Sequence, residues 1–513
     1  NNEMLFLDDI MDSPIKYEEV MGKVKIFKEV SSKIISFLTQ LEELQKKLWE
    51  KKKFIIETNY CITLDKINEK HYEKILACSE QLVEWKELFD VDVESIEDLK
   101  EEKYLVLDTK FFDMKFKYKL LSEFENLDED IDGVLINSEN FGALNLLQDR
   151  YKEQVKTVYI DPPYNKGNDF AYKDNYMHSS WLSLMLDRLN LSYNLLTKKG
   201  LLFGSIDENE VINFSKLKEA TLFNDFKLLP AITNLKGNQD TEGFVSTHEY
   251  ILTFTKNSLV DIGRFDVDEE VLLSQWSEDE YGLYKKADGL RATGTNAPRN
   301  KRPNLWYPIF INEHTEEIYT TEDNLPKIDT DISLLPINDN NEELSWYWKK
   351  SKVNDENYNL ILTKTNNGYS IYKKQRAKIG DIPTRKPKSF FYDAQYSSTN
   401  GGNELKKLFN QRMSEFTPKS VALLKDIFVI GSEHDSIILD YFAGSGTTGN
   451  SVINLNREDN GKRKYILVEM GDYFDSITKP RIQKVIYTNS WKEGKPITKN
   501  GISQIFKYFK LES

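Results

Sequence analysis

The chain has 513 residues, 39% of them hydrophobic and 12% aromatic, which excludes a disordered polymer and allows several packed cores. Its length predicts about three domains. Its 69 basic and 83 acidic residues give a formal charge of -14, which by itself argues against nucleic-acid binding. The charge is uneven, however: residues 1–130 carry a net of -11, and the other 383 residues a net of only -3.

Two cysteines, Cys61 and Cys78, cannot build a disulfide framework, and with five histidines and no Cys-x-x-Cys pair they predict no metal site. Low cysteine content is typical of a reducing cytoplasm. The apolar runs fall far below the ~18 residues that span a bilayer. No secretory signal pattern follows Asn1, so we expect a cytoplasmic protein without a membrane partner.

Residues 1–130 are predicted to form a helical region. Apolar residues recur at three- and four-residue steps from Ile26 to Leu48, with Lys and Glu between them. The pattern allows a coiled coil, but the next position of the seam is Lys51. A local helical hairpin is therefore the favoured interpretation.

After this region, β-rich runs alternate with helical stretches, which predicts a mostly parallel sheet with helices on both faces. The alternation covers residues 131–257, stops over residues 258–400, and returns over residues 401–513. The middle stretch is loop-rich, with much Asn, Asp, Thr, Tyr and Trp. One α/β domain in two parts is therefore interrupted by a long insertion. The predicted strands include residues 158–160, 200–206, 248–255, 437–440 and 465–469, and the predicted helices residues 181–196, 211–222 and 420–429.

A glycine-rich turn over residues 440–449 follows one of these strands. Gly444 and Gly446 let the backbone approach a ligand without a Cβ clash, and open α/β sheets bind ligands beyond the carboxyl ends of their strands. Glu469 ends the next strand, where a carboxylate can accept hydrogen bonds from two ribose hydroxyls. The turn lacks the Gly-Lys-Ser/Thr ending of a phosphate loop. With Gly449 it matches the GxGxxG spacing, which leaves a nicotinamide or flavin cofactor open at this point.

Another predicted strand ends directly in Asp161-Pro162-Pro163-Tyr164. The two prolines fix the backbone and remove two donors, so the turn presents a carboxylate, the Pro162 carbonyl and a tyrosine ring together. The two oxygens can accept hydrogen bonds from a planar exocyclic amine, which exposes its nitrogen lone pair for attack. Tyr164 can stack on an aromatic base, worth ~1–3 kcal/mol. Because a base inside a duplex is out of reach, the target must be flipped out.

The two motifs together resemble those of amino-group DNA methyltransferases that use S-adenosylmethionine, in the motif order of the beta class. Residues 161–189, the stretch His248–Leu252 and Phe416-x-Pro418-Lys419 are similar to the modification (Mod) subunit of type III restriction–modification systems. The resemblance covers about residues 131–475. It implies a Rossmann-like methyltransferase fold with permuted motif order and a site-specific DNA adenine-N6 methyltransferase.

The resemblance also implies the residues of the site. Upstream of the DPPY motif, Ser138 stands where the family often has glycine, and Glu139 where it has Asp or Asn. The implied catalytic residues are Asp161, Pro162, Pro163 and Tyr164, with no metal ion. The implied cofactor-binding residues are Asp440, Phe442, Ala443, Gly444, Ser445, Gly446, Thr447, Glu469, Lys419, Glu139, Asn140 and Asn165.

The insertion, residues 258–400, is the predicted target-recognition domain. Residues 285–302 carry a local net charge of +5 and residues 361–420 a net of +8, with aromatic side chains among the basic ones. Such interleaving suits phosphates and unstacked bases. The predicted DNA-binding residues are Lys285, Lys286, Arg291, Arg299, Lys301, Arg302, Lys373, Lys374, Arg376, Arg385 and Lys386.

Two other functions remain open. A cytosine-N4 methyltransferase uses the same chemistry, although serine is more usual at the position of Asp161 in that group. The other alternative is a chain that mainly recognises DNA and guides a nuclease partner. The expected partners are double-stranded DNA, a second copy of the chain in a homodimer, and a restriction (helicase–nuclease) subunit.

Overall fold

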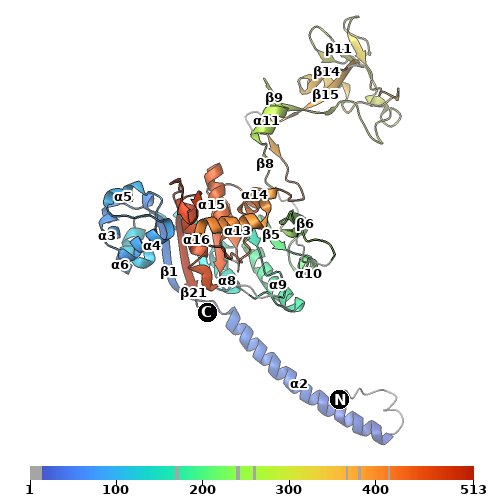
Figure 1. The fold of residues 1–513 in the computed structure, drawn as a ribbon. Helices are drawn as coiled ribbons and strands as arrows, with labels where there is room; N and C mark the ends of the chain where they lie inside the picture. Colours follow the sequence, from blue (N-terminus) through green and yellow to red (C-terminus); the bar gives the residue numbers. More distant parts are fainter. Residues whose placement is uncertain are drawn as a thin grey trace. The chain divides into compact units, whose positions relative to one another are not determined.

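The computed structural model divides the chain into two compact units, Asn1–Gly263 with Lys388–Ser513, and Arg264–Pro387 (Figure 1). The structure describes residues 14–167, 173–237, 243–257, 262–365, 368–378, 383–413 and 416–512. No helix in these ranges combines the length and the apolar character needed to cross a membrane.

The first unit is built on a ten-stranded sheet, in the order β2-β1-β21-β3-β18-β17-β4-β5-β7-β6. The six strands from β21 to β5 are parallel, and antiparallel pairs follow at both ends. This confirms the predicted α/β class. The strands are β1 (Ile55–Thr63), β2 (Val106–Asp108), β3 (Gly133–Asn137), β4 (Val155–Ile160), β5 (Leu196–Ile206), β6 (Asp225–Ile232), β7 (His248–Thr255), β17 (Ile437–Asp440), β18 (Lys464–Glu469) and β21 (Ile505–Leu511).

Two sets of helices pack on this sheet. One contains α8 (Asn140–Tyr151), α9 (His178–Leu195) and α10 (Val211–Ala220), and the other α14 (Val421–Gly431), α15 (Thr447–Asp459) and α16 (Thr478–Tyr487). The β4-α9-β5 and β17-α15-β18 connections run in opposite directions across the sheet. Right-handed crossovers therefore put α9 and α15 on opposite faces. The strands between them, such as β4, are buried along their length, as parallel strands covered on both faces should be.

Residues 1–130 were predicted to be mostly helical, and their described part also contributes two strands to the sheet, which we did not predict. β1 pairs with both β2 and β21, so the two ends of the chain together extend the sheet. The apolar and β-branched run in β1 suits a strand, but its partner lies more than 400 residues away, beyond the reach of local periodicity. The short helices of this region are α3 (Tyr72–Leu76), α4 (Ser79–Phe89), α5 (Ile96–Glu101), α6 (Met114–Leu121) and α7 (Leu127–Asp130).

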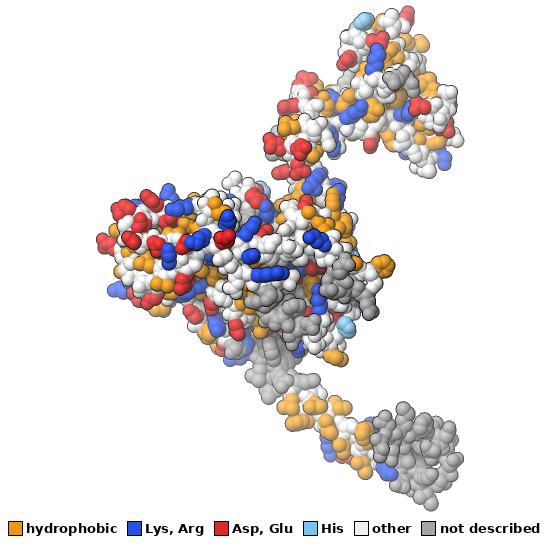
Figure 2. Space-filling model, viewed as in Figure 1, with side chains coloured by type: hydrophobic (Ala, Val, Ile, Leu, Met, Phe, Trp, Pro, Cys, Tyr) orange, Lys and Arg blue, Asp and Glu red, His pale blue; other side chains and the backbone are white. Residues whose placement is uncertain are grey.

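The predicted helical hairpin is wrong. Residues 14–50 form one helix of 37 residues, α2 (Pro14–Glu50). From residue 23 to residue 50 the sequence contains no Gly, Pro, Asn or Asp, so nothing there favours a turn. Apolar side chains on its described part, residues 21–41, are exposed, among them Phe27 at 75% and Ile35 at 63% (Figure 2).

The second unit has its own sheets and its own core. Leu290, Tyr307, Ile309, Trp346 and Val353 are buried together there, which explains why this stretch is compact by itself. A four-stranded sheet has the order β14-β15-β10-β9, and a three-stranded sheet the order β12-β11-β13. The strands are β8 (Phe265–Asp266), β9 (Trp276–Asp279), β10 (Gly282–Gly289), β11 (Ile309–Ile311), β12 (Ile318–Tyr319), β13 (Ile332–Leu334), β14 (Leu360–Thr365), β15 (Gly368–Arg376) and β16 (Thr384–Arg385), and the helices α11 (Glu269–Gln275) and α12 (Lys350–Asp355).

Candidate active site at the ends of two neighbouring strands

The two sequence motifs meet at one edge of the large sheet. β4 ends just before the DPPY turn (Asp161–Tyr164), and β17 ends at Asp440, the first residue of the glycine loop (residues 440–449). The strands are parallel neighbours, with Asp440 in register with Tyr159. After β4 the chain continues to β5, which lies on one side of this pair of strands. After β17 it continues to β18, which lies on the other side. This divergence is a topological switch point, where open α/β sheets bind their ligands.

Packing against α9 holds the DPPY turn. The Nε1 of Trp181, a fully buried side chain, donates a hydrogen bond of 2.8 Å to the Pro163 carbonyl. The Pro162 carbonyl accepts no hydrogen bond from the described residues. Oδ1 of Asp161 is enclosed and likewise accepts none, although Lys419 Nζ lies 3.3 Å away as an ion pair. Because Oδ1 is enclosed while the Asp161 side chain is 28% exposed, the turn offers an amine the Pro162 carbonyl and the other carboxylate oxygen, Oδ2.

Four polar side chains meet behind this turn. Glu249 Oε2 accepts hydrogen bonds from Tyr164 Oη at 2.9 Å and from Lys419 Nζ at 2.7 Å. Burial raises the pKa of Asp161, and Lys419 opposes the rise. Burial also acts to raise the pKa of Glu249, but Lys419 lowers it overall. The pKa of Lys419 is raised because the two carboxylates outweigh its burial. Lys419 is thus an ammonium ion shared by two acids.

The glycine loop adopts the backbone that its sequence predicts. Gly444 has φ 51° and Gly446 has φ 84°, values that favour glycine. Glu469, at the end of β18, accepts a hydrogen bond of 2.8 Å from Gly444 N and another from Gly471 N. Burial raises the pKa of Glu469, and these backbone donors oppose the rise. The Tyr473 side chain and the Met470 amide also donate to Glu469, so a ligand hydroxyl would take the place of one of these donors.

Asp440 is buried and fixes the start of the loop. Its Oδ1 accepts a hydrogen bond of 2.9 Å from Phe442 N, and its Oδ2 one of 2.5 Å from Thr448 Oγ1. Burial raises its pKa to about 7, and Asp161 and Glu469 add to the rise. A buried acid with acidic neighbours favours a positively charged ligand, which would restore its ionised form.

Glu139 and Asn140 lie beside the same loop. Asn140 Nδ2 donates a hydrogen bond of 3.0 Å to the Tyr441 carbonyl. Glu139 caps α8 by accepting from the Phe141 and Gly142 amides. Arg188 of α9 bonds to both of them, donating to Glu139 Oε1 and Asn140 Oδ1. The implied upstream residues are therefore adjacent to the cofactor loop and are fixed there by an arginine.

Four implied cofactor residues have other contacts. Lys419 lies against the DPPY turn, and its Nζ donates to Tyr164 Oη at 2.5 Å. Asn165 Nδ2 donates to Glu210 Oε1 at 2.6 Å, which ties the segment after the DPPY turn to the start of α10. The side-chain hydroxyls of Ser445 and Thr447 accept from Arg481 at 2.8 and 2.9 Å, so they face the protein interior.

Three residues of this region escaped our sequence-based prediction: Glu249, Arg188 and Arg481. Glu249 and Arg188 lie in stretches that resemble the Mod family, yet a resemblance of a stretch assigns no role to a residue. Arg481 is fully buried on α16 and its only signal would have been a charge within an apolar helix face. Their significance depends on contacts between distant segments.

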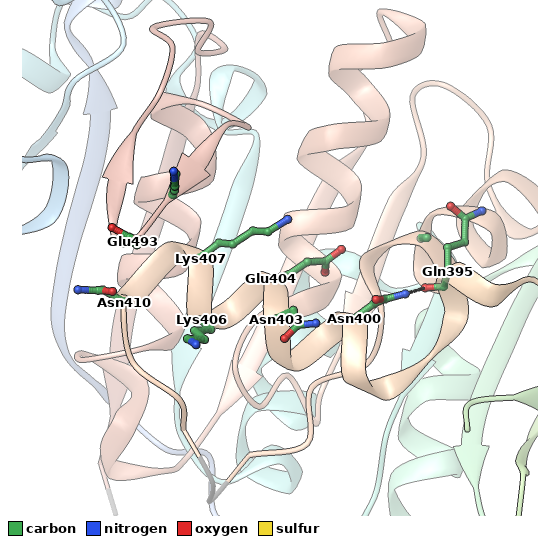
Figure 3. A pocket seen from close by; sticks show the side chains of 10 residues that line it. Gln395, Asn400, Asn403, Glu404, Lys406, Lys407, Asn410 and Glu493 are labelled. Carbon is green, nitrogen blue, oxygen red and sulfur yellow. Dashed lines mark hydrogen bonds between the residues drawn. The ribbon is translucent and has the colours of Figure 1, made fainter. Parts of the chain in front are cut away.

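Two cavities of the first unit lie away from the strand ends. One of about 440 Å³ follows the polar side of α13 (Ser398–Phe409) and is lined by Asn400, Asn403, Glu404 and Lys407 among others (Figure 3). Another of about 210 Å³ includes Asn137, at the end of β3. Neither contains a residue of the DPPY turn or the glycine loop. The strand ends, not the cavities, define the candidate site.

The basic residues predicted to bind DNA lie in the second unit, and most of them contact other residues of that unit. Lys374 and Arg376 form ion pairs with Asp279 at 2.7 and 2.6 Å, and Arg376 holds the pKa of Asp279 well below its usual range. Most of the others contact a ring, a carbonyl or an acid: Lys285, Lys286, Arg291, Arg299, Lys373 and Arg385. Within the described ranges, the side chains of Lys301, Arg302 and Lys386 make no such contact.

The fold and the site define a class of protein: an open α/β sheet with a candidate ligand site at its switch point, beside a DPPY turn. The family described as DNA methylase (N6_N4_Mtase) matches residues 155–479, and the chain belongs to it.

Several known proteins are similar to this chain. The type III restriction-modification enzyme EcoPI Mod subunit of Escherichia phage P1 is 39% identical over 73% of this chain. The chain covers 62% of that protein's length. The type II methyltransferase M.KpnI of Klebsiella pneumoniae is 28% identical over 77% of this chain and 96% of its own length. Among solved structures, the M1.HpyAVI-SAM complex is 13% identical, with a TM-score of 0.31 over 68% of this chain and 98% of its own.

Proposed function

We propose that this chain is a site-specific DNA adenine-N6 methyltransferase that uses S-adenosylmethionine, and that it is the modification component of a type III restriction–modification system. The observation that carries the proposal is the juxtaposition of the DPPY turn and the glycine loop at the ends of β4 and β17. Membership of the DNA methylase family and the similarity to the EcoPI Mod subunit support it.

The residues of the glycine loop fit S-adenosylmethionine. This molecule carries a sulfonium and an ammonium group, and buried Asp440, with Asp161 and Glu469 near it, favours a cation. Gly444 leaves open space where a Cβ would stand, so a ligand can approach the backbone. Glu469 ends the next strand, where a carboxylate can accept hydrogen bonds from ribose hydroxyls in place of one of its present donors. When bound, S-adenosylmethionine supplies an electrophilic methyl group.

The DPPY turn performs the rest of the chemistry on the base. Asp161, through its other oxygen Oδ2, and the Pro162 carbonyl accept hydrogen bonds from the exocyclic amine of the target base, because Oδ1 is enclosed against Lys419. Holding the amine between two acceptors directs its nitrogen lone pair and restricts its motion. Tyr164 stacks on the ring of the base, which must be flipped out of the duplex to reach this position.

The second unit is proposed to recognise the target sequence. The insertion that we expected over residues 258–400 contains this unit, Arg264–Pro387, with its own core. Its unpaired basic residues suit phosphate contacts, which set the position of a protein on DNA. Its basic residues that are already paired with acids or rings are better explained as structural.

We propose that two copies of the chain form a homodimer in which their α2 helices pack together. Val24, Phe27, Ile34, Leu38 and Leu41 follow heptad spacing and are all more than 40% exposed. The flanking apolar residues Ile26, Val30, Ile35 and Phe37 are exposed as well, and an apolar surface of this kind is typical of an interaction site. A helix of this length gains its stability mostly from packing. A restriction subunit is the second proposed partner, on the similarity to Mod subunits alone.

The decisive experiment incubates the protein with S-adenosylmethionine and unmethylated genomic DNA and maps modified bases by single-molecule sequencing. We expect N6-methyladenine at one recurring sequence. The Asp161→Asn variant, purified in the same way, controls for contaminating enzymes. N4-methylcytosine would correct the target base, and the absence of any modification would overturn the proposal. Co-purification of a helicase–nuclease without modification would favour a recognition subunit.

A further inference from the structure

Glu249 lies at the centre of the contacts behind the DPPY turn, although nothing above gives it a function. It is the second residue of β7, a strand that is separated from β4 by β5. One oxygen, Oε2, accepts from both Tyr164 Oη at 2.9 Å and Lys419 Nζ at 2.7 Å. Three segments that are far apart in sequence are therefore joined by one carboxylate oxygen.

Each of these bonds restrains a group that faces the target base. The bond to Tyr164 fixes the far end of a ring whose plane must match the plane of the base. The bond to Lys419 competes with Asp161, which lies 3.3 Å from the same ammonium. Lys419 is thus divided between the two carboxylates, and its shorter contact is the one with Glu249.

We propose that Glu249 is a positioning residue for methyl transfer, an inference that rests on the proposed function. It keeps the Tyr164 ring in its stacking position, and it shares the charge of Lys419 with Asp161, so that Asp161 remains a strong acceptor for the target amine. Without the charge of Glu249, Lys419 pairs with Asp161 alone and weakens it as an acceptor. Lys419 itself then inhibits the site that it otherwise stabilises.

A purely structural carboxylate would behave differently. If Glu249 only neutralised Lys419, its loss would destabilise the fold or weaken all ligands alike. A positioning residue affects the chemical step and the stacking of the base, while cofactor binding stays the same. Its effect is also coupled to the Tyr164 hydroxyl through which it acts.

The experiment uses the full chain and a duplex that carries the mapped target site. Single-turnover methylation rates are measured for Glu249→Gln, Tyr164→Phe and the double variant, with Glu219→Gln on the exposed side of α10 as the matched control. Binding of a non-reactive S-adenosylmethionine analogue is measured by calorimetry. The fluorescence of 2-aminopurine at the target position reports the stacking of the base.

We expect Glu249→Gln to slow methylation about ten- to a hundredfold, the scale expected when one buried hydrogen-bond network is broken. Analogue binding should stay within about twofold of the unmodified protein. The double variant should be no slower than Glu249→Gln within about twofold, because both changes break one bond. The 2-aminopurine signal should rise as the base loses its stacking partner.

Multiplicative rate losses in the double variant would overturn the inference, as would a full rate in Glu249→Gln. If Glu249→Gln fails to fold, Tyr164→Phe tests the same bond by the 2-aminopurine signal, and an unchanged signal overturns the inference. If the unmodified protein methylates no DNA, the proposed function fails instead. The two failures are therefore distinguishable.

Discussion

At the scale of single residues, the chemistry depends on whether each carboxylate accepts a proton, a cation or an amine. Asp161, Asp440 and Glu469 all have raised pKa values because burial disfavours their charge. They differ in what offsets that cost. Asp161 has Lys419, Glu469 has backbone donors, and Asp440 has only its two hydrogen bonds within the glycine loop.

Replacement of Asp161 by asparagine should separate catalysis from binding. The amide keeps the shape of the turn but removes the charge that polarises the target amine. We expect methylation to fall about a hundred- to a thousandfold, the scale of removing one preorganised electrostatic interaction. Calorimetry with a non-reactive cofactor analogue should show binding close to normal. Asp187→Asn, at an exposed position of α9, is the control, and full activity of Asp161→Asn would contradict the mechanism.

The pKa of Asp440 predicts a pH dependence of cofactor binding. In the free protein burial raises this pKa to about 7, so below that pH the carboxyl is mostly protonated. A cationic ligand favours the ionised form, and binding then releases a proton. Affinity should therefore rise with pH up to about 7 and level off above it. Calorimetry at pH values from about 5.5 to about 8.5, in steps of about half a pH unit, tests this prediction.

The Asp440→Asn variant is the control for that measurement. It keeps an acceptor for Phe442 N but cannot ionise, so its affinity should be lower and flat across the same pH range. If the affinity of the unmodified protein does not change with pH, or falls as pH rises, the ionisation of Asp440 is not coupled to ligand binding.

At the scale of elements, α2 exposes a row of apolar side chains over its described part, residues 21–41. Ile34→Glu with Leu38→Glu places two charges on that face, and the burial of each replaced apolar side chain is worth ~1.5–3 kcal/mol. We expect dimer dissociation to become at least about a hundredfold easier. Sedimentation velocity would then report a mass near the monomer's 60.0 kDa. Ser32→Glu with Ser36→Glu, off the heptad positions, should leave the dimer intact.

A monomeric mass for the unmodified chain, with and without DNA, would remove the homodimer from the proposal. It would leave the methyltransferase proposal untouched, because the DPPY turn and the glycine loop both belong to one chain.

At the scale of the whole molecule, charge is organised by region. Figure 2 shows acidic side chains gathered over α3–α6, where Glu69, Glu73, Asp90, Glu94 and Glu97 are exposed. The second unit is itself slightly acidic, with a net charge of -3 over residues 264–387. DNA contact therefore cannot depend on the overall charge of that unit, and must depend on its local, unpaired cations.

This distinction gives a two-part test. Replacing Lys301, Arg302 and Lys386 by alanine should weaken DNA binding at all sequences and lower the salt slope by about 1 for each phosphate that is no longer neutralised. Fluorescence anisotropy over a salt series measures both. Replacing Arg376 by alanine should instead lower the thermal stability of the second unit, because it leaves Asp279 without its main partner. An unchanged salt slope in the triple variant would exclude these three residues from the DNA interface.

Much of the first unit was predictable from local pattern. The strands and helices around the two motifs appear at the expected places, since apolar runs that end in turn residues are strong signals. β21 and the pairing of β1 were not predictable in this way, because each strand depends on a partner at the other end of the chain. The length of α2 was misjudged because we interpreted the end of the seam as a turn.

The sequence by itself determined the chemistry of the site. Asp161-Pro162-Pro163-Tyr164 and the glycine loop specify their own local backbone, because proline restricts φ and lacks an N–H donor, and glycine permits positive φ. Tertiary structure alone decided which residues surround them. Lys419 lies against the DPPY turn, Arg188 fixes the neighbours of the glycine loop, and Glu249 joins Tyr164 to Lys419. Strand order and helix packing, which depend on the whole sheet, place these side chains, and no local pattern records them.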